Sequence, residues 1–466
     1  MNYQSLAIEN TSVDFGELPT GSGAISTDTR KIQKGDIFIA LNGENFKGAQ
    51  FIEEAIVKGA RVLVVNKDEV GSASALIAES DVCLITVGDT TQYLQDLSQA
   101  RLKEWRSTEG KNVIAITGSN GKTTTKEMVS FILNELFPNK VQATSGNLNN
   151  HLGVPLTVLS VEDDHDWLIV EMGTNHPGEI GFLAKLVQPD YAVITSIGAS
   201  HLEFFGTVHE VLKEKSSLFH EVLNCSNKSP SCFYSALEEH LNEEFEDHDK
   251  VTTLGIPGDA FEIKKTTHQS FDLNTTEGAI HLHASKLLGI HNYQNLHLAL
   301  GLVQAITQVD DFRMLARIAN KFEPSEKRSV WEKRSGVNVF VDCYNANPTS
   351  MKAALDSFID RVKNESKLEH ALFVLGDMYE LGEDSERFHQ QIGKKLQTDG
   401  ISHCRFVGKF AQQYADGFGK KCLTFEKTED LVSPFRKEAR SYKYIFIKGS
   451  RGVKLENLLS KKPSTK

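Results

Sequence analysis

The chain has 466 residues, and its 51 lysines and arginines against 62 aspartates and glutamates give a net charge of −11. Hydrophobic residues make up 40% and charged residues 24%, as in ordinary globular proteins, and the length suits about three domains. An acidic chain does not attract nucleic acid or an anionic membrane surface in bulk, so any anionic ligand must be held by a local site. The six cysteines form no C-x-x-C motif, and no apolar run approaches the roughly 18 residues of a membrane span. We therefore expect a cytoplasmic protein without structural zinc, membrane insertion or bound nucleic acid.

Short apolar runs alternate with helix-length stretches along nearly the whole chain. Runs of a few residues rich in valine and isoleucine, apolar on both faces, are typical of buried parallel strands. Their alternation with helical patterns predicts an α/β fold. The strands predicted in this way are 61–65, 82–87, 113–117, 167–171, 191–196, 338–343, 371–375, 404–407 and 443–448.

Two polar segments predict domain boundaries. The first is 107–111, STEGK, directly before a predicted strand, and the second is 323–329, EPSEKRS, which combines a proline with a charge cluster. The predicted domains are 1–108, 109–325 and 326–466. The stretch 224–285 contains the acidic run EEHLNEEFEDHDK, and we interpret it as solvated helix faces and loops.

The strongest local signal is VIAITGSNGKTTTKEM at 113–128, where a strand enters a glycine-rich turn and a helix leaves it. Gly118 and Gly121 allow backbone conformations that point successive N–H groups at one anion, and the helix N-terminus adds its dipole. Lys122 can neutralise phosphate oxygens, and the Thr123 hydroxyl can bind Mg²⁺. The spacing is T-G-x-x-G-K-T, shorter than the common G-x-x-x-x-G-K-[ST] pattern. The predicted nucleotide site comprises Thr117, Gly118, Ser119, Asn120, Gly121, Lys122, Thr123 and Thr124.

Other polar side chains follow the neighbouring strands. Glu171 ends a predicted strand, at the sheet edge where α/β folds bind ligands, and is a candidate Mg²⁺ ligand. His201 follows the next strand, but imidazole is not a preferred Mg²⁺ ligand, so the residues alone leave its role open. Lys213 and Lys215, in HEVLKEKSSLF, are by themselves typical of exposed helical lysines.

Eight motifs occur in an order that resembles the Mur ligase family. They are TGSNGKTTTKEM (117–128), GNLNNHLGVPLTVL (146–159), EMGTNHPGEI (171–180), HLEFFGT (201–207), HNYQN (291–295), DCYNANPTSMKAAL (342–355), LGDMYELGEDSERFH (375–389) and KGSR (448–451). Segment 26–60 is similar to the uridine-nucleotide domain of this family. The resemblance covers all three domains except roughly 224–285.

This resemblance implies a small mixed α/β N-terminal domain for the UDP part of the substrate, a central P-loop ATPase domain and a Rossmann-like C-terminal ligase domain. It implies ATP-dependent addition of D-alanyl-D-alanine to UDP-N-acetylmuramoyl-tripeptide, in the peptidoglycan synthesis of a bacterial cytoplasm. The terminal carboxylate first becomes an acyl phosphate. A free carboxylate would have to expel oxide when an amine attacks it, whereas the acyl phosphate expels phosphate, which is a good leaving group. Such phosphoryl transfer needs charge neutralisation and alignment, which Lys122 and Mg²⁺ supply. We expect a monomer.

The family roles transfer residue by residue. Lys122, Glu171, His201 and Lys215 are the implied catalytic residues. Thr123, Glu171, His201 and Lys215 are the implied ligands of two Mg²⁺ ions, with Lys215 as its carbamate, although Lys213 leaves room for an alignment slip of two residues. Asn295 is implied at adenine, Asp342 at the ribose and Arg328 at the phosphates. The implied substrate contacts are Thr27, Asp28 and Arg30 for the uridine nucleotide, Asn147, Asn149 and Asn150 for the muramoyl peptide, and Asn345 and Asn347 at the C-terminal site.

Several other functions are compatible with parts of this pattern. A related ligase that adds diaminopimelate or lysine shares the uridine-nucleotide domain, and the third residue of the accepted peptide stays open between these two. Folylpolyglutamate synthetase shares the P-loop but lacks the domain that 26–60 resembles. A P-loop switch would hydrolyse ATP without ligation, and product mass would distinguish these possibilities.

Overall fold

The structure is a computed structural model that describes residues 1–9, 11–43, 46–72, 77, 80–255, 263–265, 271–275, 278–282, 290–323 and 330–460. It separates into two compact units. Unit 1 consists of residues 1–114, 139–172 and 182–189, and unit 2 consists of residues 115–138, 173–181 and 190–466.

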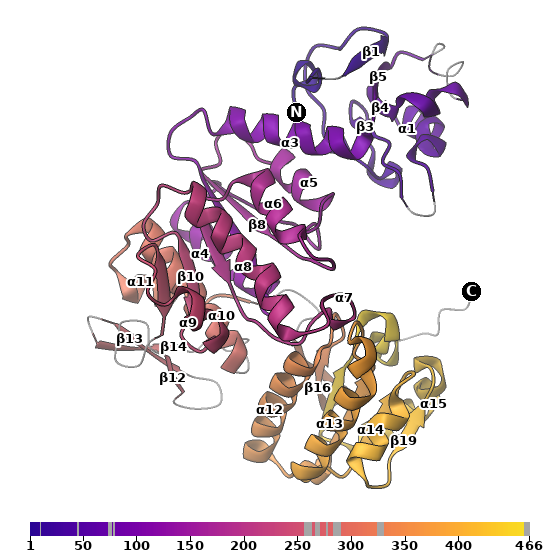
Figure 1. Ribbon diagram of the computed structural model, residues 1–466. Helices are drawn as coiled ribbons and strands as arrows, with labels where there is room; N and C mark the ends of the chain where they lie inside the picture. Colours follow the sequence, from indigo (N-terminus) through magenta and orange to yellow (C-terminus); the bar gives the residue numbers. More distant parts are fainter. Residues whose placement is uncertain are drawn as a thin grey trace. The chain divides into compact units, whose positions relative to one another are not determined.

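A five-stranded sheet of order β1-β5-β4-β3-β2 forms the N-terminal part of unit 1 (Figure 1). Strands β2 to β5 run parallel, and β1 pairs antiparallel with β5 at one edge. Side chains alternate between two cores, one shared with α3 and with α5 (Gly153–Leu159) and the other with α1. The elements are β1 Ser12–Phe15, β2 Ile25–Ser26, β3 Ile37–Ile39, α1 Ile52–Val57, β4 Val62–Asn66, β5 Cys83–Val87 and α3 Thr90–Trp105, with 3₁₀ turns at Tyr3–Leu6, Thr29–Lys31, Gly48–Phe51 and Lys67–Ser72.

The division between the units falls inside β6. Unit 1 continues the sheet from β6 to β8 and β7, and unit 2 continues it from β6 to β9, β10 and β11. The pairs β7–β8, β9–β10 and β10–β11 are parallel. The elements are β6 Asn112–Thr117, α4 Lys122–Leu136, β7 Val141–Ala143, α5 Gly153–Leu159, β8 Trp167–Glu171, α6 Glu179–Val187, β9 Tyr191–Ile194, α7 Leu202–Phe205, α8 Val208–Cys225, β10 Cys232–Ser235, α9 Glu239–Phe245 and β11 Val251–Leu254.

Unit 2 also contains an antiparallel three-stranded sheet and a second six-stranded sheet of order β15-β16-β20-β17-β18-β19. In the latter, β15 is antiparallel to β16 and the other pairs are parallel. Helices α12, α13 and α14 pack on one face, and α15 packs on the other (Figure 1). The elements are β12 Ile263–Lys265, β13 Phe271–Thr275, β14 Gly278–Leu282, α10 Ile290–Thr307, α11 Phe312–Ala319, β15 Val330–Arg334, β16 Val337–Asp342, α12 Pro348–Glu365, β17 Ala371–Gly376, α13 Ser385–Thr398, β18 Cys404–Val407, α14 Ala411–Phe418, β19 Leu423–Phe425, α15 Thr428–Glu438 and β20 Tyr444–Lys448, with 3₁₀ turns at Leu368–His370, Gly382–Asp384, Ala439–Ser441, Arg451–Val453 and Leu455–Leu459.

The nine predicted strands are all present, and the expected α/β architecture with parallel sheets is confirmed. The interpretation of 224–285 as solvated helix faces and loops is wrong in part. Strand β10 is buried over its whole length in the central sheet, and α9 buries Leu241 and Phe245. Polar residues surround both apolar segments, which masks them in the sequence. No helix in the described part of the chain is long and apolar enough to cross a membrane.

Candidate active site

The phosphate loop joins β6 to α4 as the sequence predicts. Gly118 has φ +148° and Gly121 has φ +84°, both in the region that side chains disfavour. A Cβ atom on Gly118 would lie 2.0 Å from Thr195 Oγ1, and one on Gly121 would lie 2.4 Å from Asn295 Oδ1. Both positions therefore require glycine for space as well as conformation. The second contact also places Asn295, the predicted adenine ligand, directly against the loop.

The loop after β9 holds the phosphate loop in shape. Ser119 donates its backbone N–H to the Ser196 carbonyl at 2.8 Å, and Asn120 donates its N–H to Ser196 Oγ at 2.9 Å. Thr195 Oγ1 donates to the Asn120 carbonyl at 2.5 Å. These bonds satisfy polar groups of the loop that would otherwise be unpaired, so the loop keeps a fixed conformation.

Lys122 is the first residue of α4, and its Nζ donates to the Gly118 carbonyl at 2.6 Å. The Lys122 side chain therefore folds back onto its own loop, where its positive charge would neutralise a bound phosphate. Thr123 follows in the first turn and is 6% exposed, and Thr117 is fully buried at the end of β6. The contiguous residues 117–124 thus form one structural feature.

Glu171 ends β8 in unit 1 and is 2% exposed. Its Oε1 accepts a hydrogen bond from Asn149 Nδ2 at 2.8 Å, whereas its Oε2 is buried without a hydrogen-bond partner. An unpaired buried carboxylate oxygen is unfavourable unless a cation or donor satisfies it. Of the other predicted peptide-binding asparagines, Asn150 caps the start of α5 by accepting from the Gly153 N–H at 2.9 Å, and Asn147 lies in the same loop.

His201 precedes α7, and its backbone is left-handed with φ +53°. Its Nδ1 lies 2.7 Å from Oε2 of Glu380, in the loop that follows β17. The contact is short but bent, since it lacks hydrogen-bond alignment. The His201 ring lowers the pKa of the Glu380 carboxyl, against the effect of burial and with smaller help from Lys122. The candidate metal ligand is thus paired with a carboxylate from the C-terminal sheet.

The two lysines of α8 lie in opposite environments. Lys215 is 1% exposed, whereas the Lys213 side chain is 76% exposed and lies 3.9 Å from Glu210. Burial lowers the pKa of Lys215 well below its ordinary value, the nearby charge of Lys122 lowers it further, and Glu214 opposes the shift. Glu214 is itself buried and accepts the backbone N–H groups of Gly178 and Ile180 at 2.6 and 2.8 Å.

Asp342 ends β16 and forms an ion pair with Lys448, at the end of the adjacent β20, with 2.5 Å between Oδ2 and Nζ. Lys448 is 1% exposed and also donates to the Asn345 carbonyl at 3.1 Å. Burial lowers the pKa of the His291 ring to about 4. The charge of Asp342 opposes this shift, and the charge of Lys448 adds to it. A lysine inside a parallel sheet therefore fixes the carboxylate that we predict at the ribose.

Asn347 begins α12 as its N-cap. Its Oδ1 accepts the Ser350 N–H at 2.8 Å, and its Nδ2 donates to Oδ1 of Asn120 in the phosphate loop at 2.8 Å. Asn345, two residues earlier, bonds to the next backbone N–H through its own Oδ1. The oxygen and the nitrogen of the Asn347 side-chain amide are therefore both engaged in hydrogen bonds within the protein, which the sequence did not predict.

The residues predicted at the uridine nucleotide form a local cluster in unit 1. Asp28 caps a 3₁₀ turn, and Arg30 makes two 2.8 Å hydrogen bonds to its carboxylate. These bonds from Arg30 lower the pKa of Asp28 to about 2. Thr27 is half-buried beside them. Arg328, predicted at the phosphates, lies outside the described residues.

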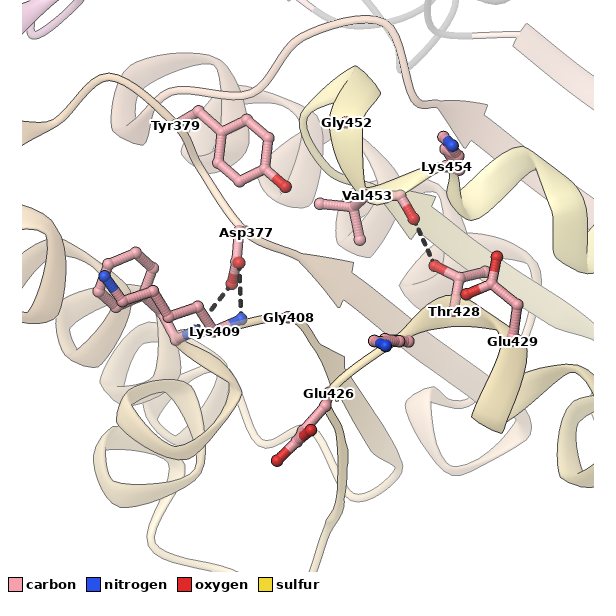
Figure 2. Close-up of a pocket in the computed structure, with 12 residues that line it drawn as sticks. Asp377, Tyr379, Gly408, Lys409, Glu426, Thr428, Glu429, Gly452, Val453 and Lys454 are labelled. Carbon is pink, nitrogen blue, oxygen red and sulfur yellow. Dashed lines mark hydrogen bonds between the residues drawn. The ribbon is translucent and has the colours of Figure 1, made fainter.

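A cavity of about 430 Å³ opens at the carboxyl ends of β17, β18 and β19 (Figure 2). Asp377 accepts the N–H groups of Lys409 and Phe410 at 2.8 and 3.0 Å, and burial raises the pKa of its carboxyl. Tyr379, one residue before Glu380, forms part of the rim. The wall carries charges of both signs, from Asp377, Lys409, Glu426, Lys427, Glu429 and Lys454.

Three residues at the site received no role from the sequence: Glu214, Glu380 and Lys448. Glu380 lies inside the motif LGDMYELG and Lys448 inside KGSR. The sequence therefore marked both segments, but it gave neither residue a role. Glu214 had no comparable signal, because its partners belong to another segment of the chain.

Three family models match the chain in succession. They are the Mur ligase family catalytic domain at 23–102, the Mur ligase middle domain at 116–303 and the Mur ligase glutamate ligase domain at 328–451. The chain is 32% identical to the UDP-N-acetylmuramoyl-tripeptide–D-alanyl-D-alanine ligase of Bacillus subtilis, with 93% of this chain and 92% of the relative covered. It is 30% identical to the ligase of that name from Escherichia coli, with 94% and 92% covered.

Solved structures agree with this likeness. A crystal structure of MurF from Acinetobacter baumannii has a TM-score of 0.84 at 28% identity and covers 98% of this chain and 97% of its own. MurF ligase from Thermotoga maritima, in complex with ADP, has a TM-score of 0.76 at 24% identity, with 94% and 96% covered, and supports the fold.

Proposed function

The chain belongs to the Mur ligase family, and from this we propose that it uses ATP to add D-alanyl-D-alanine to UDP-N-acetylmuramoyl-tripeptide in peptidoglycan synthesis. The observation that carries the proposal is full-length similarity, at 30% identity or more, to relatives of that name. The tripeptide carboxylate attacks the γ-phosphorus of ATP and releases ADP. The amine of the dipeptide then attacks the acyl phosphate, the new C–N bond forms, and phosphate leaves with one amine proton lost to solvent.

The phosphate loop is the part of the site that binds ATP. The N-terminus of α4 and the Lys122 ammonium both favour a polyphosphate. The Ser119 and Asn120 N–H groups do not contribute to this binding, because they are bonded to Ser196. Asn295 packs on Gly121, and we assign it to the adenine base from the family resemblance. Asp342 is held at a strand end by Lys448, as a ribose acceptor must be held. We also assign Arg328 to the phosphates, from the family resemblance.

The residues present fit a divalent cation. The unpaired Oε2 of Glu171 is a buried hard oxygen, and Thr123 presents a hydroxyl in the first turn after the loop. We propose Thr123, Glu171 and His201 as ligands of Mg²⁺, with two ions expected. Bound Mg²⁺ would neutralise the charge that builds on the transferring phosphoryl group.

We assign the modified lysine to Lys215 and not to Lys213. A carbamate forms when a neutral amine attacks CO₂, makes an N–C bond and loses a proton, so a lowered pKa favours it. Lys215 is buried and has that lowered pKa, whereas Lys213 is exposed on the surface of α8. The carbamate oxygens would be anionic ligands for a second Mg²⁺, which an ammonium cannot be.

Substitution of the two lysines tests this assignment. Lys215→Ala should be nearly inactive and should regain some activity with added formate or acetate, which can occupy the vacated space. Lys213→Ala should ligate at close to the wild-type rate and gain nothing from either anion. A carbamate ¹³C resonance after incubation with labelled bicarbonate should appear in the wild type and be missing from Lys215→Ala. The reverse pattern would move the role to Lys213, and no loss in either variant would exclude the carbamate.

The cavity of Figure 2 is our candidate for the incoming dipeptide. D-alanyl-D-alanine carries one carboxylate and one ammonium, and the wall offers Lys409, Lys427 and Lys454 for the first and acidic groups for the second. Tyr379, which lines the cavity, directly precedes Glu380 in the chain, and Glu380 contacts the proposed metal ligand His201. We keep Asn345 and Asn347 as predicted substrate contacts, from the family resemblance.

Product mass is the decisive experiment. The chain, ATP and MgCl₂ are incubated with D-alanyl-D-alanine and with UDP-N-acetylmuramoyl-tripeptide ending in either diaminopimelate or lysine. We expect one dipeptide to be added with loss of water and one phosphate to be released per product, and the preferred tripeptide identifies the third residue. Addition of a single amino acid would indicate a related ligase. ATP turnover that is independent of both substrates would indicate a P-loop switch.

A further inference from the structure

We propose that Glu380 is a positioning residue that holds the imidazole of His201 by its Nδ1 edge and so presents Nε2 to Mg²⁺. The inference rests on the proposed role of His201 and assigns a function to a carboxylate of the C-terminal sheet. The juxtaposition that carries it is the 2.7 Å contact between His201 Nδ1 and Glu380 Oε2.

The backbones that carry the two residues are joined independently of this contact. Glu203 donates its N–H to the Glu380 carbonyl at 3.1 Å. A Cβ on Gly382 would lie 3.1 Å from the Glu203 Cα, so the two segments touch. Phe388, at the start of α13, packs on a small apolar cluster formed by Leu202, Phe205 and Val211. The 201–205 segment is therefore docked on the 380–388 segment by polar and apolar contacts.

Both members of the pair have unusual backbones. Glu380 has φ +64° and His201 has φ +53°, and each is a side-chain-bearing residue in the left-handed region. Such conformations are unfavourable outside glycine and are found where the surrounding structure determines them, often at functional sites. Here they turn two side chains from distant segments toward each other.

The loop of Glu380 is itself rigidly held. His389 is fully buried, accepts the Met378 N–H on Nε2 at 2.9 Å and lies 2.6 Å from the Ser385 carbonyl through Nδ1. Tyr379 donates its N–H to Ser450 Oγ at 3.0 Å. A carboxylate on a fixed loop can fix its partner, whereas one on a mobile loop cannot.

The chemistry of histidine ligands explains why such a partner is useful. The hydrogen bond made by one ring nitrogen selects the tautomer and leaves the lone pair of the other nitrogen free. Carboxylates in this second position orient the ring and strengthen the ligand, and their loss typically lowers metal affinity by about 10- to 100-fold. A bent contact of this kind can align when the ligand binds.

Metal binding tests the inference without relying on turnover. Mn²⁺, a paramagnetic stand-in for Mg²⁺, is titrated into the full chain with saturating ADP, and the free ion is followed by electron paramagnetic resonance. His201→Ala should weaken one class of Mn²⁺ site. Glu380→Ala should weaken the same class by about tenfold or more, and Glu380→Gln, which retains an acceptor oxygen, should fall between. Glu383→Gln, an exposed glutamate on the same turn, is the matched control and should bind like the wild type.

The ring ¹⁵N shifts of His201, assigned by comparison with His201→Ala, give a second readout that simple destabilisation would not produce. Without metal, the wild type should show Nδ1 protonated and Nε2 free, and Glu380→Ala should shift the population toward the other tautomer. If His201→Ala weakens Mn²⁺ binding but both Glu380 variants bind within twofold of the wild type, the positioning role is wrong and the proposed metal ligand stands. If His201→Ala leaves Mn²⁺ binding unchanged, both proposals fall.

Discussion

Glu214 should be one of the most sensitive positions on α8, although it touches no predicted ligand. Its carboxylate accepts the N–H groups of Gly178 and Ile180 at 2.6 and 2.8 Å and the Thr174 hydroxyl at 3.2 Å. The first two donors belong to the N-terminus of α6, where backbone N–H groups have no partner within the helix. Glu214 therefore caps α6 from a different helix.

The size of the effect follows from these bonds. A hydrogen bond to a charged group contributes about 1.5–3 kcal/mol, and loss of a helix cap costs about 0.5–2 kcal/mol. Since Glu214→Ala removes both acceptors at once, we expect local opening of the α6 N-terminus to become easier by about 3 kcal/mol. Glu214→Gln keeps one acceptor oxygen but turns an NH₂ group toward the other donor, so about half of that loss is expected.

Hydrogen exchange measured by mass spectrometry is the appropriate assay, because a multidomain chain has no single unfolding free energy. Peptides that cover 174–187 should exchange roughly a hundredfold faster in Glu214→Ala, the factor that corresponds to about 3 kcal/mol. Glu210→Ala, one turn earlier and half-exposed, is the control and should exchange like the wild type in that segment. Exchange in Glu214→Ala within threefold of the control would refute the capping argument.

Two further predictions concern the phosphate loop and pH. Lys122→Ala should lower kcat/KM for ligation by about a hundredfold, or roughly 2.7 kcal/mol of barrier, with an unchanged circular dichroism spectrum, and a loss below threefold in a phosphate-release assay would contradict the assignment. Burial lowers the pKa of His389 to about 4, so the folded chain keeps this ring neutral while the unfolded chain protonates it below about pH 6.5. Stability from this group is complete above pH 6.5 and is lost as the pH falls toward 4, by about 2 kcal/mol at pH 5. Between pH 7 and pH 5, His389→Gln should therefore lose less hydrogen-exchange protection in peptides that cover 376–398 than the wild type does, after correction for the intrinsic exchange rate, and equal losses would disprove it.

The sequence predicts the interior of this fold well and its edges poorly. Buried parallel strands such as β8 and β17 are apolar on both faces, and that composition is visible without coordinates. Strands β2 and β7 are two or three half-buried residues long and carry no such signal. The edge strand β15 has the sequence VWEKR, which ends in three consecutive charged residues, so only its pairing with β16 identifies it.

The spacing of apolar residues along α8 distinguishes Lys215 from Lys213. The buried positions of α8 include Val211, Lys215, Leu218 and Val222, which recur at helical spacing on one face. Lys213 lies outside that face. A lysine in phase with the apolar residues is expected to be buried, and this reasoning from the sequence alone favours Lys215.

Glu380 and Lys448 could not be placed by any local pattern. Their partners, His201 and Asp342, lie more than a hundred residues away in the chain, and neither partnership follows a helical or strand period. Single-sequence reasoning detects chemistry within one turn or one strand. It does not reach a pair of side chains that only the tertiary fold brings together.

The contacts within unit 2 link the phosphate loop and the candidate metal ligand to the C-terminal sheet. Asn120 bonds to Asn347 at the start of α12, and His201 contacts Glu380 after β17. The middle-domain match ends at 303 and the glutamate ligase-domain match begins at 328, so each pair spans two family domains. An acyl phosphate hydrolyses if water reaches it, and the dipeptide amine must approach the same carbon. Under the proposed function, a site whose phosphate loop and candidate metal ligand both contact the second domain is complete only when the two domains are in contact. Activation of the carboxylate would then be coupled to delivery of the amine.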